Sequence, residues 1–146
     1  MIVVILVRVV MMVVVMVRRF IGGCGGSGFP ASRKWALALR NEGPRRLVVN
    51  AQEGEPGTRK DRYLLEHHPL RVMVGAALVA RVIQAEQIDV VVDPKFEVGL
   101  EGLRAAWRRL AKAQAKALPI ARFHRGPGLY VAGEESALIN YLEGRR

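Results

Sequence analysis

A cluster of glycines between residues 22 and 28 is the first segment whose residue types could do chemistry. Residues Gly23 to Gly28 read G-C-G-G-S-G and satisfy the pattern G-x-G-x-x-G. Because glycines have no side chain, backbone N–H groups in such a turn can approach a phosphate at the start of a helix. Lys34 would supply a nearby positive charge, and Phe29 a flat surface for a ring. A flexible loop explains the same glycines, so this segment alone is a weak indication.

An amide and two carboxylates follow in the segment from Asn50 to Thr58, which reads N-A-Q-E-G-E-P-G-T. Glycine and proline punctuate the segment, and a short apolar run precedes it, so we expect a loop after a strand. The side chains of Asn50, Glu53 and Glu55 could hydrogen-bond ribose hydroxyls or the edge of a heterocycle. A polar turn with a helix-capping role is the alternative interpretation.

A third segment, from Gly126 to Ser136, reads G-P-G-L-Y-V-A-G-E-E-S. Its two acids, Glu134 and Glu135, come at the expected start of a helix, where the helix dipole favours negative charge. Helix capping therefore explains the two glutamates as well as ligand contact does.

Alternating apolar and amphipathic stretches predict the elements that would position these segments. Three ranges are expected as strands: 47–49, 88–92 and 118–123. Helices are expected from Pro30 through Leu39 and over 61–68, 69–85, 97–117 and 134–142, with a glycine-containing loop at 124–129. The helix at 69–85 is apolar nearly all round, which predicts that it is buried. Strands alternating with helices predict an α/β fold whose mainly parallel sheet binds ligands at the carboxyl ends of its strands.

The first 17 residues are apolar except for Arg8. A membrane-spanning helix needs about 20 apolar residues, so this stretch is at the lower limit. A signal peptide matches poorly, because no positive residue precedes the apolar run and Arg18 and Arg19 stand where small cleavage-site residues belong. A membrane anchor, a buried strand or helix, and an ill-ordered or non-native leader all stay open. The β-branched content favours a strand if the stretch is ordered.

Charge and cysteine content narrow the classes of partner. The net charge of +10, from 23 Lys and Arg against 13 Asp and Glu, favours phosphates, anionic lipid or an acidic protein face. The single cysteine, Cys24, excludes an internal disulfide and an all-cysteine metal or iron–sulfur site within this chain. Basic residues repeat every four positions from Arg104 to Lys116 without an aromatic platform, which favours a water-facing side or an acidic partner subunit over nucleic acid. The histidines at 67–68 predict a solvated helix end rather than a metal site.

Taken in order, the three segments resemble the flavoprotein subunit of respiratory NADH:quinone oxidoreductase. The family pattern reads G-R-G-G-A-G-F-P-T-G-x-K-W, then N-A-D-E-x-E-P-G-T with K-D-R-Y downstream, then G-A-G-x-Y-x-C-G-E-E-T-A-L and E-G-R-R. The corresponding stretches here are Gly23 to Trp35, Asn50 to Thr58 with Lys60 to Tyr63, Gly126 to Leu138, and Glu143 to Arg146. The resemblance covers Gly22 to Arg146, and modules of NAD-reducing hydrogenases and NAD-linked formate dehydrogenases are similar.

The resemblance implies a Rossmann-like domain at 21–146, incomplete at its carboxyl end, after an apolar leader at 1–20. It implies that FMN lies across the strand ends and that NADH stacks over FMN to pass it a hydride, with no side chain acting as general acid or base. The residues carried over to FMN are Gly23, Gly25, Gly26, Gly28, Lys34, Asn50, Glu53, Tyr130, Gly133 and Glu134. Those carried over to NADH are Phe29, Glu55 and Glu135.

The resemblance also implies the partners and the location of the chain. Other subunits of an NADH-oxidising complex would be partners, and the electrons would pass to an iron–sulfur chain outside this polypeptide. We expect a cytoplasmic position peripheral to a membrane-bound respiratory complex. Direct membrane contact is expected through residues 1–17 if at all, and nucleic acid is not an expected partner.

Departures from the family pattern reduce the expected cofactor affinity. Cys24 replaces an arginine, Gln52 an aspartate used at the flavin, Leu37 an aromatic that commonly stacks on adenine, and Ala132 a cysteine. The chain also ends at Arg146, before the family's asparagine-rich FMN-contacting segment and its cysteine cluster. Two alternatives follow: a catalytically inactive remnant that docks a partner through its basic helix, or a membrane-tethered small protein.

Overall fold

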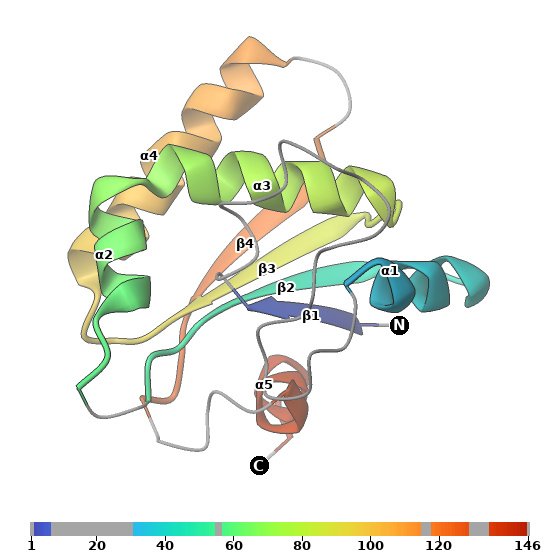
Figure 1. Ribbon diagram of the computed structural model, residues 1–146, viewed down its shortest axis with the longest axis horizontal. Coiled ribbons are helices and arrows are strands. Elements are labelled where there is room, and N and C mark those ends of the chain that lie inside the picture. The colour runs from blue at the N-terminus through green and yellow to red at the C-terminus, as the bar shows by residue number, and fades with distance from the viewer. Residues whose placement is uncertain (1, 7–30, 55–56, 115–117, 129–134, 146) are drawn as a thin grey trace.

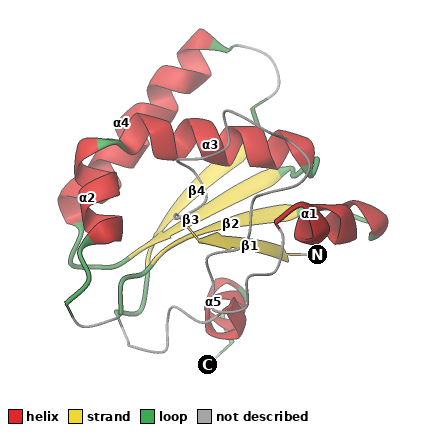
Figure 2. Cartoon of the chain, in the orientation of Figure 1, coloured by secondary structure: helices red, strands yellow, loops and turns green. Residues whose placement is uncertain are grey.

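The computed structural model describes residues 2–6, 31–54, 57–114, 118–128 and 135–145. The elements in chain order are β1 (Ile2–Leu6), α1 (Ala31–Arg40), β2 (Arg46–Ala51), α2 (Lys60–His67), α3 (Pro69–Val82), β3 (Gln87–Val92), α4 (Glu97–Ala113), β4 (Ile120–Arg125) and α5 (Glu135–Leu142). Figure 2 shows how the helices surround the strands. Strands and helices alternate along most of the chain, as the sequence pattern predicts.

The four described strands form one sheet in the order β1-β2-β3-β4, and each pair of neighbours is parallel. Ala51 pairs with Val92, and Val92 pairs with Arg125, so β2, β3 and β4 end at the same level. The expected α/β fold with a parallel sheet is therefore confirmed. Its carboxyl edge is the place where such sheets bind ligands.

Helices cover the two faces of the sheet unequally (Figure 1). Alternate residues of β2 and β3, such as Leu47 and Val90, belong to the main core, which contains residues of α1, α2, α3 and α4. On the other face Leu138 of α5 packs with Val48 and Val91. Because successive side chains of a strand point to opposite faces, strands with both faces buried have nearly continuous apolar runs.

Several expected boundaries and one expected burial were wrong. The helix expected at 97–117 ends at Ala113, and the strand expected at 118–123 begins at Ile120. His124 and Arg125 belong to β4, so the following loop begins at Gly126 rather than at 124. The helix expected to reach residue 85 ends at Val82, and its outer face is not buried: Leu78 is 41% and Val82 is 49% exposed. The prediction from the apolar composition therefore overestimated how much of the α3 surface the neighbouring elements cover.

Residues 2–6 of the apolar leader form β1, which pairs in parallel with β2. This is the strand alternative that the β-branched composition favours. Among the residues that the structure describes, no helix has the length and apolar character to cross a membrane.

Candidate functional site

The carboxyl ends of three adjacent strands bring two of the predicted segments together. Asp93 donates its N–H to the carbonyl of Ala51 at 3.1 Å, and Gly126 donates its N–H to the carbonyl of Val92 at 2.8 Å. These bonds extend the strand ladder by one residue, so the row beyond the strand ends consists of Gln52, Asp93 and Gly126. The segment after β2 and the segment after β4 therefore lie at one edge, on the two sides of β3.

Gln52 crosses this edge and reaches the segment after β4. A Cβ built on Gly126 would lie 1.8 Å from Gln52 Nε2, so the absence of a side chain at Gly126 is what admits the carboxamide. Gln52 is 6% exposed, and neither its Nε2 nor its Oε1 has a hydrogen-bond partner in the described part of the chain. An unpaired polar group in the interior costs about 1–3 kcal/mol, and most buried polar groups are paired. The carboxamide is thus an unsatisfied donor and acceptor at the carboxyl edge.

Asn50, predicted to contact FMN, lies beside Gln52 and shapes its backbone. Asn50 is 1% exposed, and its Oδ1 accepts the N–H of Gln52 at 3.0 Å. A side-chain amide that binds the backbone two residues ahead forms an Asx-type turn. This turn sets the direction in which the chain leaves β2.

Glu53, also predicted to contact FMN, caps the amino end of α2. Its carboxylate accepts the N–H groups of Asp61 at 3.1 Å and Arg62 at 3.3 Å, donors that have no partner within the helix. Burial acts to raise the pKa of Glu53, but these two hydrogen bonds and the nearby Lys60 outweigh it, so the pKa is lower than usual. The structure therefore realises the capping alternative for Glu53.

The segment after β4 is held by residues of α4, α5 and the loop between β3 and α4. The Arg125 guanidinium bonds the Glu97 carboxylate at 2.6 and 3.0 Å, and Tyr141 Oη donates to the Arg125 carbonyl at 2.5 Å. Gly128 has φ +67°, a conformation that favours glycine, and a Cβ there would lie 2.9 Å from Pro94 Cγ. These contacts fix where the loop leaves the sheet.

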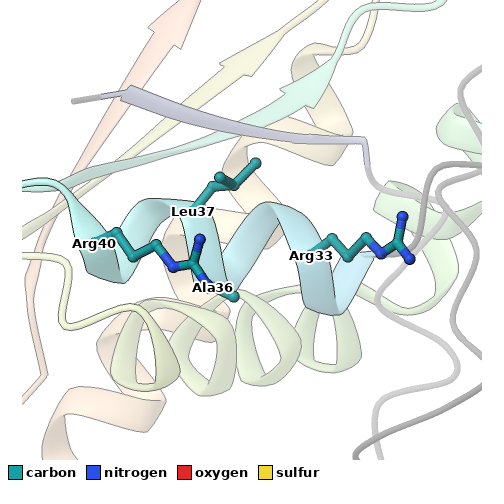
Figure 3. A pocket seen from close by; sticks show the side chains of 4 residues that line it. All are labelled: Arg33, Ala36, Leu37 and Arg40. Atoms are coloured by element: carbon teal, nitrogen blue, oxygen red, sulfur yellow. The ribbon is translucent and has the colours of Figure 1, made fainter.

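Helix α1 presents a shallow pocket with two guanidinium groups. Figure 3 shows the four lining residues, which all come from α1: Arg33, Ala36, Leu37 and Arg40. Leu37 is 49% exposed, and neither arginine is in an ion pair within the described part of the chain. The pocket therefore combines an apolar surface with positive charge.

Sequence reasoning missed a buried carboxylate on the α5 face of the sheet. Asp89 of β3 has no exposed surface and is bonded by Arg46 of β2 at 2.7 Å, Gln87 of β3 at 2.8 Å and His124 of β4 at 2.8 Å. Burial acts to raise the pKa of Asp89, but these partners outweigh it and hold the pKa below its usual range. An aspartate inside an apolar strand was the available signal.

The remaining predicted site residues lie mostly outside the described part of the chain. Lys34 is in the first turn of α1, and α1 runs antiparallel to β2 (Figure 3), so its first turn points toward the carboxyl ends of the strands. Glu135 is the first residue of α5. The predicted residues outside the described ranges are Gly23, Gly25, Gly26, Gly28, Phe29, Glu55, Tyr130, Gly133 and Glu134.

Comparison with known proteins identifies the family of the chain. Residues 17–146 match the family model described as the Nuo51 FMN-binding domain. The chain belongs to this family. Because the match covers most of the sequence, it includes the segments after β2 and β4 that meet at the carboxyl edge of this Nuo51 domain.

Several curated proteins and solved structures are similar to this Nuo51 domain. A subunit of the NADH-quinone oxidoreductase of Aquifex aeolicus is 37% identical over 132 residues, which is 85% of this chain and 31% of the Aquifex protein. The mitochondrial NADH dehydrogenase [ubiquinone] flavoprotein 1 of Dictyostelium discoideum is 32% identical, over 85% of this chain and 28% of that protein. The chain thus spans about a third of the length of these relatives.

A solved NAD+-reducing [NiFe]-hydrogenase, in its H2-reduced state, has the same fold. It superposes with a TM-score of 0.77 at 43% sequence identity, over 83% of this chain and 21% of the hydrogenase chain. In its air-oxidised state the TM-score is 0.72 at 40% identity. The chain is therefore similar to this hydrogenase in sequence as well as in fold.

The described residues of the edge fit a flat heterocyclic cofactor. The unpaired Gln52 carboxamide offers a donor and an acceptor, and Gly126 presents backbone without a side chain beside it. A site for FMN needs such convergent polar groups next to a surface that a ring can approach.

Proposed function

We propose that this chain is an FMN-binding, NADH-oxidising module of a larger electron-transfer assembly. The observation that carries the proposal is the meeting of Gln52 and Gly126 at the carboxyl edge of a parallel sheet, since these residues come from two of the three segments on which the resemblance depends. Membership of the Nuo51 FMN-binding domain family supports FMN as the cofactor. Bound FMN would supply the redox chemistry, as an acceptor of hydride from NADH and a donor of single electrons to the next carrier.

The residues of this chain bind and orient, and the redox chemistry belongs to the cofactor. We assign Asn50 to the FMN site directly and Glu53 to the organisation of the loop between β2 and α2. The glycine segment with Lys34, and the segment with Tyr130, Gly133 and Glu134, complete the proposed FMN site.

We assign the proposed NADH contacts to three further residues: Phe29, Glu55 and Glu135. The α1 pocket, with Leu37 between two arginines, supports an anionic ligand that carries an apolar ring. A dinucleotide has both features, because its pyrophosphate is anionic and its bases are flat.

The name of the Aquifex relative, a subunit of NADH-quinone oxidoreductase, supports partner subunits for this chain. Arg108, Arg109 and Lys112 are exposed on α4, and this basic surface would suit an acidic partner subunit. We place the module in the cytoplasm, peripheral to the membrane.

Titration of the purified chain with FMN tests the proposal. We expect quenching of flavin fluorescence with a Kd below about 100 μM, which corresponds to roughly 5–6 kcal/mol, and NADH-dependent reduction of ferricyanide by the flavin-loaded chain. Absence of FMN binding at that concentration would remove the enzymatic function from the chain.

A matched pair of variants tests the position of the site. Asn50→Asp keeps an oxygen that can accept the Gln52 N–H but removes the amide donors and adds a negative charge at the edge. We expect at least a tenfold loss of FMN affinity. Asn140→Asp makes the same change at an exposed position on α5 and should leave the affinity unchanged. Thermal melting of both variants separates a loss of binding from a loss of folding.

A further inference from the structure

The Gln52 carboxamide has no hydrogen-bond partner among the residues that the structure describes, although neighbouring polar side chains at this edge are used. Asn50 Oδ1 accepts the backbone N–H of Gln52, and Asp93 Oδ1 accepts the Lys95 N–H at 2.9 Å. Within the described ranges neither polar atom of the Gln52 side chain is paired, although the residue is more than nine-tenths buried. The protein thus orders the backbone around this amide and leaves the amide itself unsatisfied.

The amide lies at the carboxyl edge of the sheet, the edge at which parallel sheets bind ligands. Gln52 follows the last residue of β2, and its amide lies against Gly126, which follows the last residue of β4. Parallel sheets bind their ligands outside the carboxyl ends of the strands. The terminal torsion of a glutamine side chain is broad, so the amide can turn its two polar atoms toward a ligand beside Gly126.

The chemistry of an amide restricts the group that can satisfy it. A carboxamide offers an acceptor oxygen and an N–H donor side by side, whereas a carboxylate can only accept. Its best partner therefore presents a donor and an acceptor side by side, as a lactam, imide or primary amide does. The pyrimidine edge of a flavin and the carboxamide of a nicotinamide ring both have this arrangement.

We propose that Gln52 is a specificity-determining residue that pairs through both atoms of its carboxamide with the amide-type edge of the ring bound at the carboxyl edge. This inference rests on the proposed function. It assigns to Gln52 the recognition of a neutral edge with both a donor and an acceptor. A ligand that lacks either half of that edge binds less tightly.

Comparison of FMN with 3-methyl-FMN, in which a methyl group replaces the imide N–H hydrogen, tests the flavin arm. We expect the full wild-type chain to bind the methylated flavin at least tenfold more weakly. Gln52→Met, similar in shape but without the amide, should bind FMN more weakly and bind the two flavins within about twofold of each other. Gln114→Met, at an exposed position after α4, should keep the wild-type discrimination.

Comparison of NAD+ with its thioamide analogue, in which sulfur replaces the carboxamide oxygen, tests the nicotinamide arm. A wild-type preference for NAD+ that Gln52→Met removes would assign the pairing to the nicotinamide. Gln52→Glu keeps the size and the acceptor but loses the donor, so it should no longer distinguish NAD+ from the thioamide. This variant provides the test if Gln52→Met does not fold.

The outcomes separate the inference from the proposed function. Equal affinity of the wild-type chain for FMN and 3-methyl-FMN, together with equal affinity for NAD+ and its thioamide, overturns the role of Gln52 and leaves a flavin-binding module. A wild-type chain that binds neither FMN nor NAD+ overturns the proposed function itself.

Discussion

His124 Nε2 lies 2.8 Å from Asp89 Oδ1, which joins β4 to β3 through a carboxylate with no exposed surface. Arg46 holds the other oxygen of the same carboxylate from β2, so one side chain ties three strands together on the α5 face. His124 is two residues before Gly126, where the candidate site begins. The cluster therefore sets the position of β4 relative to the site.

Replacement of Asp89 by Asn should destabilise the fold in a pH-dependent manner. The lowered pKa means that the folded state favours the charged carboxylate, so its stabilisation is present above the unfolded value of about 3.9 and is lost as the pH falls through the folded pKa. We expect a loss of about 2–4 kcal/mol at pH 7, because Arg46 and His124 lose the charge they bind. Urea unfolding at pH 7 and at about pH 3 measures both effects.

The difference in the free energy of unfolding between wild type and Asp89→Asn should be smaller at the lower pH. Glu101→Gln, in the surface pair with Arg104, serves as a control and should change stability little at either pH. A difference for Asp89→Asn that is the same at both pH values would contradict the role of the charged carboxylate.

Two glycines of α4 should differ in their tolerance of alanine. A Cβ on Gly99 would lie 2.7 Å from Leu65 Cβ, an atom that the backbone of α2 fixes in place, whereas a Cβ on Gly102 would lie 3.4 Å from Pro69 Cγ. Alanine favours a helix by up to about 1 kcal/mol over glycine. We therefore expect Gly99→Ala to lose about 1–3 kcal/mol and Gly102→Ala to be neutral or stabilising.

Thermal melting of the two α4 variants checks this expectation. Each variant is the control for the other, since both make the same change on the same helix. Equal destabilisation of the two would mean that close packing of α2 on α4 at Leu65 is not the cause.

Replacement of Glu53 by Gln should weaken the start of α2. The glutamine would keep one acceptor oxygen and lose the charge that favours the helix amino end, so we expect a loss of about 1 kcal/mol at pH 7. Because the pKa of Glu53 is lowered, this contribution is present above the unfolded value of about 4.3 and is lost as the pH falls. Hydrogen exchange at the amides of Asp61 and Arg62 measures the local effect.

Glu42→Gln, at an exposed position between α1 and β2, is the matched control and should leave those amides unchanged. Faster exchange at Asp61 and Arg62 in the Glu53 variant supports the capping contact. Unchanged exchange in that variant would assign Glu53 to the ligand alone.

The fold was largely predictable because its signals are local. The apolar runs at β2 and β3 and the proline at the start of α3 depend on short stretches of chain, and each indicated the correct element. The Asp89 cluster was not predictable, because its partners are 43 and 35 residues away in sequence and meet through the register of the sheet. A single sequence contains no measure of that register.

The candidate site was predictable in location but less so in the roles of its residues. Asn50 and Glu53 were expected after β2 and lie there, but the choice between ligand contact and helix capping at Glu53 depends on where the amino end of α2 falls. Gln52 was noted as a departure from a family pattern. Its unpaired amide depends on the distance to Gly126, a residue on another strand.

The contact between Gln52 and Gly126 predicts that mutations of these residues are not additive. In Gly126→Ala the new Cβ would overlap the Gln52 carboxamide and displace it, and we expect a loss of about 1–3 kcal/mol. In the Gln52→Ala background the space is vacant, so Gly126→Ala should have a cost smaller by about 1–2 kcal/mol. Denaturant unfolding of the four proteins in this cycle gives the coupling free energy between the two residues.

A second cycle pairs Gly126→Ala with Gln114→Ala, and the Gln114 side chain is exposed after α4. The changes in the free energy of unfolding should be additive in this second cycle. Additive effects in the first cycle as well would show that Gln52 and Gly126 do not touch in solution.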